Sequence, residues 1–494
     1  MGADAVILLI VVAYMAILLG IGAAAARLTH SPEDFFLAGR SLGSWVTAIS
    51  STAASESGWV VLGAVGMTYV EGVAALWFAP SCLMGYWINL YVLAPRLRRE
   101  AARTGSLTLP DLLAARFSDP LHLVRLISVS VILLSLGTYV AAQVTATGKA
   151  MQAILGVSYG RGIAVGGAII VVYTIMGGFR AVSWTDFFQG MIMVLALVAM
   201  PLAALAKVGG YTAMLDSLAA VNPALVTVTG NRTGFALFGF LTGLLGIGLG
   251  YPGQPHVITR YMAASGDEKI RQSQVIAMLW GVLVFYGAGF LGLAGRTLMP
   301  DLMKPGGDPE QLFPLLARSL LHPFVAGLML AAILSAIMST VSSQLLVAAS
   351  AVSRDLCERV LGFARSGRAS VLAGRAAVLL LGVAAIVVAL QGVRVVFWFV
   401  LFAWSGMGAA FGPVLLLSLW TDLLTRRGAL AGMVTGFVVT VAWNTSGLSD
   451  RVIYELVPAF LLAGAVALAV SWLDRRLSAQ AGATPTAISS SAAR

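Results

Sequence analysis

An apolar stretch of the chain, residues 331–355, carries an unusual run of side-chain hydroxyl groups. The stretch is long enough to cross a bilayer as a helix, since about 20 apolar residues suffice. Helical spacing of three or four residues places four small side chains on one face: Ala336, Ser339, Thr340 and Ser343. Such a face either lets a neighbouring helix approach closely or offers hard oxygen ligands to a small cation.

A carboxylate, Glu56, lies in the middle of a second apolar stretch, residues 46–66. The residues around it, from Ser50 to Gly58, are small and polar, which predicts a break in the helix. A carboxylate at membrane depth is costly and indicates a functional site. Backbone carbonyls freed by a break are tolerated there only where they are buried or line a cavity. The alternative is a structural role, in which Glu56 pairs with an arginine or caps a helix.

A second interrupted span is predicted at residues 233–257, which end in GIGLGYPGQPH. Its glycines, together with Pro252 and Pro255, cannot hold a regular helix throughout. Two broken helices in corresponding positions of two halves mark the binding site of a secondary transporter built from inverted repeats.

The elements that must position these residues are membrane-spanning helices. Hydrophobic residues make up 59% of the 494 residues, charged residues only 11%, and the mean hydropathy is +0.91. These values are typical of an all-α integral membrane protein. About 13 apolar segments have spanning length: 5–26, 46–66, 70–94, 126–148, 159–177, 187–206, 233–252, 274–298, 323–352, 374–391, 394–420, 429–445 and 452–473.

The two broken segments open two groups of five spans each, the second to sixth and the seventh to eleventh. Because five is odd, the groups have opposite orientation, so the repeats are inverted. The predicted organisation has an extra N-terminal helix and loop, a first repeat, an external loop, a second repeat, two further helices and a disordered cytoplasmic tail. Their bounds are 1–45, 46–206, 207–232, 233–420, 421–476 and 477–494.

The net charge of +10 is explained by membrane topology rather than by nucleic-acid binding. With the N-terminus outside, most of the 31 Lys and Arg residues fall in the predicted internal loops, Arg260 among them. The sequence therefore predicts an external N-terminus and a cytoplasmic C-terminus, in a plasma membrane such as the bacterial inner membrane. Residues 5–26 are interpreted as a first membrane helix rather than a signal peptide. Cys82, Cys357 and the four histidines show no metal-ligand spacing.

Four stretches resemble the sodium/solute symporter family, and within it most the sodium/proline carriers. They are, in chain order, SLGSWVTAISSTAASESGW, GGFRAVSWTDFFQ, GLGYPGQPH and AAILSAIMSTVSSQLL. The resemblance runs from about Phe35 to Trp420. It implies two inverted five-helix repeats, with one helix before and two after, and sodium-driven uptake of a small solute.

The resemblance also implies two sets of site residues. The sodium site would take the carbonyls of Ala53, Glu56 and Ala336 and the hydroxyls of Ser339 and Thr340. The solute site would draw on Ser55, Gly58, Trp59, Tyr139, Gln143, Ile247, Tyr251 and Pro255. Three of these side chains, Trp59, Tyr139 and Tyr251, are expected to line one cavity beside the two breaks, with Ile247 bordering it.

The chain departs from the proline carriers at three of these positions. They have Asp where this chain has Ser55, Met at Glu56 and Trp at Ile247. We expect Glu56 to take over the role of that Asp and to reach back toward the ion site. Its expected partner is sodium, a helix-terminus N–H or the solute's ammonium group, since the spans offer no nearby Lys or Arg.

The predicted function is sodium-coupled symport of a small organic solute, L-proline or a related amino acid, by alternating access. A small carboxylate is the alternative solute. A channel should show filter carbonyls or charged rings, and an intramembrane enzyme needs a base beside a nucleophile; neither pattern is evident. The sequence leaves the exact solute, the ion stoichiometry and the oligomeric state open.

Overall fold

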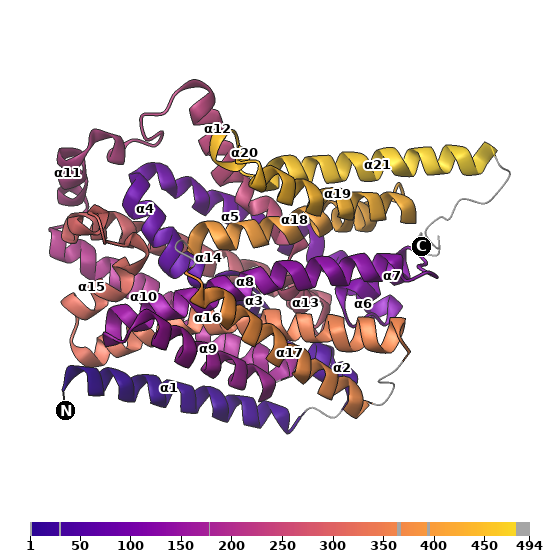
Figure 1. Cartoon of the computed structure of the whole chain (residues 1–494), viewed down its shortest axis with the longest axis horizontal. Helices are drawn as coiled ribbons and strands as arrows, with labels where there is room; N and C mark the ends of the chain where they lie inside the picture. Colours follow the sequence, from indigo (N-terminus) through magenta and orange to yellow (C-terminus); the bar gives the residue numbers. More distant parts are fainter. Residues whose placement is uncertain (1, 29–30, 177, 363–366, 393–395, 481–494) are drawn as a thin grey trace.

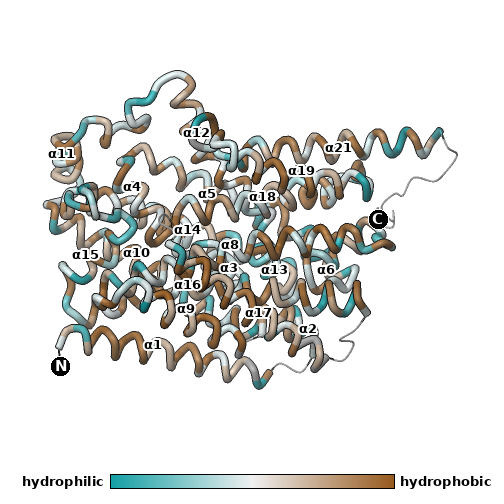
Figure 2. Tube along the Cα trace, in the orientation of Figure 1, coloured by the Kyte–Doolittle hydropathy of each residue, from teal (hydrophilic) through white to brown (hydrophobic). Residues whose placement is uncertain are grey.

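The architecture is a bundle of long helices. The computed structural model describes residues 2–28, 31–176, 178–362, 367–392 and 396–480. In this part of the chain the regular elements are all helices, and one isolated β-bridge joins Leu42 to Ala264. Most of the long helices run from one end of the bundle to the other in Figure 1, and apolar residues line much of their length in Figure 2. The prediction of an all-α membrane fold is confirmed.

Each of the thirteen predicted spans overlaps a described helix, but their exact number stays a prediction. Residues 177, 394 and 395, at the ends of two of these spans, lie outside the described residues. Within the described residues, eleven helices are long and apolar enough to cross a membrane. One of these is a continuous stretch of 46 residues, Trp59–Thr104, which covers the end of the predicted span 46–66 and the whole of the predicted span 70–94. The helix at Tyr159–Val172 is apolar but shorter than the others.

The helices follow one another along the chain in groups, and their division into two repeats stays a prediction. The N-terminal helix is α1 (Ala3–Ala26), and a short α2 (Pro32–Leu37) follows it. The next group is α3 (Ser44–Ser55), α4 (Val65–Glu71), α5 (Phe78–Trp87), α6 (Ala94–Thr104), α7 (Leu109–Arg116), α8 (Leu123–Leu155), α9 (Tyr159–Met176) and α10 (Phe179–Val208). The last groups are α12 (Gly234–Gly246), α13 (Pro255–Met262), α14 (Asp267–Leu298), α15 (Leu312–Leu320), α16 (Pro323–Ser350), α17 (Gly367–Leu390) and α18 (Val396–Trp420), then α19 (Arg426–Thr445), α20 (Leu448–Arg451) and α21 (Leu456–Gln480).

Helix α1 lies along one side of the bundle, and α19 and α21 lie along the opposite side (Figure 1). The connection predicted at 207–232 contains a helix, α11 (Tyr211–Val221). The tail was expected to be disordered from residue 477, but α21 continues to Gln480. The rest of that tail lies outside the described residues.

Both predicted helix breaks are present. Helix α3 ends at Ser55, and Glu56 has non-helical dihedral angles (φ −98°, ψ 83°) before a π-helical stretch begins at Trp59. Helix α12 ends at Gly246 and passes into a 3-10 segment, Ile247–Gly253. Pro255 then starts α13 at its first position, where the missing N–H costs nothing.

The second break packs very closely on α18. A Cβ atom at Gly250 would lie 1.9 Å from the indole nitrogen of Trp404, and one at Gly253 would lie 2.5 Å from the Met407 carbonyl. Glycine is therefore required at both positions, because any side chain would push the segment off α18.

Candidate ion and solute site

Four neutral oxygen atoms gather where α3 meets α16. The Ser339 hydroxyl lies 3.0 Å from the Ala53 carbonyl and 3.2 Å from the Ala336 carbonyl. The Thr340 hydroxyl lies 3.4 and 3.2 Å from the same two carbonyls. All four residues are fully buried. Hard, neutral oxygens at the C-terminal end of a half-helix suit a monovalent cation, because the helix dipole is negative there.

Glu56, the fifth expected ion ligand, directly follows α3. Its amide still donates to the Thr52 carbonyl (2.9 Å), which closes the last helical turn. A role for its own carbonyl at the ion stays a prediction.

The Glu56 side chain is held by three hydroxyl groups. Its Oε1 accepts hydrogen bonds from Tyr251 (2.7 Å), Tyr86 (3.0 Å) and Ser55 (3.0 Å). Oε1 therefore faces α5 and the second break, because α3 has already ended at Ser55. The expectation that this carboxylate reaches back toward the ion site stays a prediction. Of the three expected partners, a helix-terminus N–H is not among the donors to Oε1 in the described part of the chain, while sodium and the solute's ammonium group stay predictions.

The first break collects most of the predicted solute residues. The Trp59 indole donates to the Ser55 carbonyl (3.3 Å), and the Gly58 amide donates to Gln143 Oε1 (2.8 Å). The Tyr139 hydroxyl lies 3.3 Å from the Ser57 hydroxyl. Residues that are far apart in sequence, in the first break and on α8, are thus joined at one point.

The second break brings the remaining predicted residues to the same region. The Tyr251 ring packs edge-on against Tyr86 (5.2 Å between centroids) and Trp404 (4.7 Å). The Trp404 indole donates to the Ile247 carbonyl (3.1 Å). Pro255 begins α13, and its carbonyl accepts a hydrogen bond from the Thr259 hydroxyl. The two breaks therefore meet through Tyr251 and Glu56.

The expectation of one cavity shared by Trp59, Tyr139 and Tyr251 stays a prediction. A cavity of about 620 Å³ lies over the breaks, and Ile247, Phe397 and Tyr454 are among its described lining residues. Trp59, Tyr139 and Tyr251 are not among them. Their rings are almost completely buried, because they fill the space between the breaks against other aromatic side chains.

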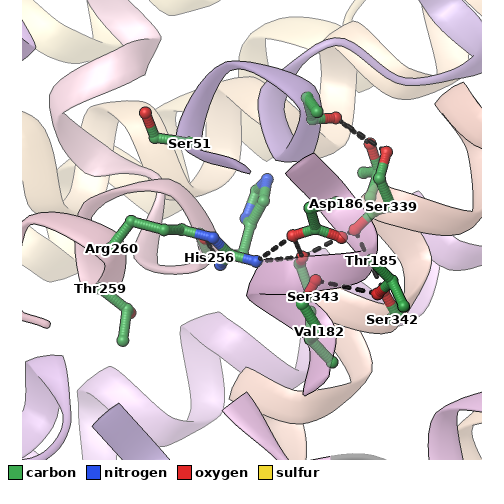
Figure 3. A network of polar contacts seen from close by, with 12 residues as sticks. Ser51, Val182, Thr185, Asp186, His256, Thr259, Arg260, Ser339, Ser342 and Ser343 are labelled. Carbon is green, nitrogen blue, oxygen red and sulfur yellow. Dashed lines mark hydrogen bonds and ion pairs between the residues drawn. The ribbon is translucent and has the colours of Figure 1, made fainter. Parts of the chain in front are cut away.

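A buried ion pair adjoins the hydroxyl face of α16 (Figure 3). Arg260 on α13 lies 2.7 Å from Asp186 on α10, and its guanidinium also donates to the Ser343 hydroxyl. The Ser343 hydroxyl lies 3.2 Å from Asp186 and 2.6 Å from the Ser339 carbonyl. Arg260 and Asp186 are fully buried, so the prediction that Arg260 lies in an internal loop is wrong.

Two buried charge clusters were missed from the sequence. Besides the pair of Asp186 and Arg260, Lys149 lies 2.5 Å from Glu310, whose carboxylate accepts the amides of Val396 and Phe397 (3.0 and 2.9 Å). The signal for Asp186 was its position in GGFRAVSWTDFFQ, directly before an apolar span. Its partner, Arg260, could not be found from the sequence, because the two residues are 74 positions apart in the chain.

An all-helical membrane bundle with two broken helices, and oxygen and aromatic groups converging on the breaks, defines a secondary transporter. The chain belongs to the sodium:solute symporter family, whose model matches residues 35–436. It is therefore a transporter and not an enzyme, and it is a multi-pass membrane protein.

Bacterial proline transporters are similar over nearly the whole chain. The high-affinity proline transporter PutP of Bacillus subtilis is 39% identical over 441 residues, which are 89% of this chain and 92% of that protein. The sodium/proline symporter of Escherichia coli K12 is 38% identical over 455 residues, 91% of this chain and 89% of that protein. The fold is similar to that of a Na⁺-coupled sialic acid symporter, with a TM-score of 0.77 and 17% sequence identity. The match covers 95% of this chain and 98% of that one.

Removing both hydroxyls of the proposed ion site should weaken sodium binding. In Ser339→Ala/Thr340→Ala the half-saturating sodium concentration for uptake should rise at least on the order of a hundredfold, since each of the two hydroxyls on a charge contributes about 1.5–3 kcal/mol. Ser350→Ala is the matched control, because within the part of the chain that the structure describes that hydroxyl bonds only the Val347 carbonyl of its own helix (2.8 Å). An unchanged sodium dependence in the double variant would show that this face serves only packing.

Breaking the buried ion pair from one side should destabilise the fold. Asp186→Asn leaves the Arg260 guanidinium buried without a countercharge, which costs about 3–5 kcal/mol. In detergent, the temperature of thermal unfolding should be clearly lower for this variant than for the wild type. It should recover in part in Asp186→Asn/Arg260→Gln. Equal stability of the single and double variants would contradict the role of the pair.

Proposed function

We propose that this protein is a sodium-coupled symporter that imports L-proline or a closely related amino acid by alternating access. The observation that carries the proposal is the convergence of the Ala53 carbonyl with the Ser339 and Thr340 hydroxyls, one helical turn before the break. The printed names of the relatives, which are proline transporters, support the solute.

Coupling follows from the placement of the two sites on one helix break. Sodium would bind where α3 meets α16, and the solute would bind where the same break meets α5, α8 and the second break. An ion that joins α3 to α16 would order the break. The solute would then bind at a smaller cost in conformational entropy. The reciprocal effect must hold as well: bound solute raises the affinity for sodium.

The transport cycle would move the two inverted repeats against each other. We assign residues 46–206 and 233–420 to the repeats, with α1, α19 and α21 outside them. Each repeat then begins with its own broken helix, α3 or α12, as folds of this kind require.

The orientation of the chain follows from its charges. Helix α6, which carries Arg96, Arg98, Arg99 and Arg103, lies toward the same end of the bundle as the C-terminal end of α21 (Figure 1). Basic residues favour the cytoplasmic side, so the C-terminus would be cytoplasmic and the N-terminus external. Protease digestion of a C-terminal tag from the outside of intact cells checks this: a tag that is cut would reverse the assignment.

The sodium gradient supplies enough energy for accumulation. A membrane potential of roughly 100 mV contributes about 2.3 kcal/mol per charge. A tenfold sodium gradient adds about 1.4 kcal/mol. With one sodium ion per solute, the sum sustains a solute gradient of several hundredfold.

Uptake of labelled L-proline into proteoliposomes tests the proposed function. An inward sodium gradient should drive accumulation above the external concentration, and an equal potassium gradient should not. The Ser350→Ala variant should behave as the wild type. Equilibration without accumulation would indicate a channel or uniporter, and the absence of sodium-dependent uptake for proline and a panel of amino acids and carboxylates would refute the proposal.

A further inference from the structure

The Glu56 carboxylate is buried with one of its oxygens unused. Oε1 accepts three hydrogen bonds, from Tyr251, Tyr86 and Ser55. Oε2 is buried and has no hydrogen-bond partner among the described residues. A buried carboxylate oxygen without a partner is unfavourable, because it has lost water and gained nothing in its place.

The described side chains also supply no cation for this carboxylate. The ion pairs formed by Arg260 and Lys149, on the neighbouring α13 and α8, are made with Asp186, Asp308 and Glu310. An ionised carboxylate in such surroundings needs a positive partner from outside the chain, either the coupling ion or the solute.

The geometry separates Glu56 from the ion site. The proposed ion ligands Ala53, Ser339 and Thr340 contact one another between α3 and α16. The carboxylate instead contacts Tyr86 on α5 and Tyr251 in the second break. The charge therefore lies toward the aromatic groups that converge on the breaks, not toward the hydroxyl face of α16.

A second unused polar group lies at the same break. Gln143 Oε1 accepts the Gly58 amide (2.8 Å), which fixes the orientation of the side-chain amide, and its Nε2 is buried without a partner among the described residues. An amide N–H₂ is a donor and suits a carboxylate, whereas the Glu56 oxygen suits an N–H donor that carries a positive charge. Glu56 Oε2 suits the ammonium group of a zwitterion, and Gln143 Nε2 suits its carboxylate.

We propose that Glu56 recognises the protonated amine of the solute, and that the solute class is therefore amino or imino acids rather than carboxylates without an amine. Oε2 accepts an N–H of the ammonium group, while Oε1 keeps its hydrogen bonds from the hydroxyls of Tyr86 and Tyr251. The inference rests on the proposed function and deepens it.

Binding of solute analogues tests this without any variant. Purified protein in sodium buffer should bind L-proline at least about tenfold more tightly than tetrahydrofuran-2-carboxylate, in which an oxygen replaces the amine, since the site's buried charge is then left unpaired. N,N-dimethylproline keeps the charge but loses both N–H donors and should bind with intermediate affinity. Equal binding of proline and the oxygen analogue would overturn the proposal.

The variant Glu56→Gln tests whether the preference for an amine depends on this carboxylate. It should weaken proline binding at least about tenfold and reduce the preference over the oxygen analogue to less than about threefold, because the charge–charge contact is gone. Sodium binding, measured without solute as sodium-dependent thermal stabilisation, should change less than about twofold. Glu56→Asp keeps the charge and should retain the amine preference, which covers the case that the Gln variant does not fold.

Glu455→Gln is the matched control. Glu455 is also a buried carboxylate that accepts from a hydroxyl, Ser405 on α18 (3.1 Å), but it is held at the start of α21. The Glu455→Gln variant should leave the preference for proline over the oxygen analogue unchanged. A Glu56→Gln variant with weakened sodium binding and an intact amine preference would assign the carboxylate to the ion instead. Sodium-driven uptake of carboxylates only would overturn this inference and leave symport standing, whereas no sodium-driven uptake would overturn the proposed function.

Discussion

The structure depends on one constraint: a helix that breaks at membrane depth must find partners for its freed backbone groups inside the protein. Side chains of two neighbouring elements supply them. Gln143 on α8 accepts the Gly58 amide, while Ser81 on α5 accepts the Gly248 amide (2.8 Å) and donates to the Leu245 carbonyl (2.7 Å). Asn89, in the helical stretch that continues α5, donates to the Tyr251 carbonyl (3.1 Å). The breaks are therefore fixed in place by polar side chains in otherwise apolar helices.

The same arrangement links the two breaks to each other. Tyr86 and Tyr251 both donate to Glu56, so the ends of α3 and α5 and the second break share one hydrogen-bonded centre. Buried hydrogen bonds of this kind are costly to leave unmade, so a movement of one break relative to the other must exchange these partners for new ones. A bound ion or solute that offers such partners shifts the balance between the arrangements by its difference in affinity for them.

Features with a local cause could be predicted from the sequence, and features made by pairing could not. The breaks follow from glycine, proline and small polar residues within a few positions, and the hydroxyl face of α16 follows from helical spacing. The burial of Arg260 depends on Asp186, 74 residues away, and on Ser343. Averaged hydropathy treats an arginine as a loop residue, because it does not register a distant countercharge. The packing of Tyr139 and Tyr251 into a filled centre likewise depends on neighbours from other helices.

The position of the carboxylate illustrates why a one-residue change matters at a helix end. Within a regular helix, a shift by one position turns a side chain by roughly 100°. Ser55 is still helical, with its hydroxyl on the Thr52 carbonyl (2.8 Å), but Glu56 lies beyond the last helical residue. Its direction is set by the break and not by helical rotation, which is why it meets Tyr86 and Tyr251 instead of the hydroxyl face. In this chain the helix end thus places neutral oxygens toward α16 and the negative charge toward the aromatic side chains, so ion binding and recognition of a charged solute can be served by separate groups.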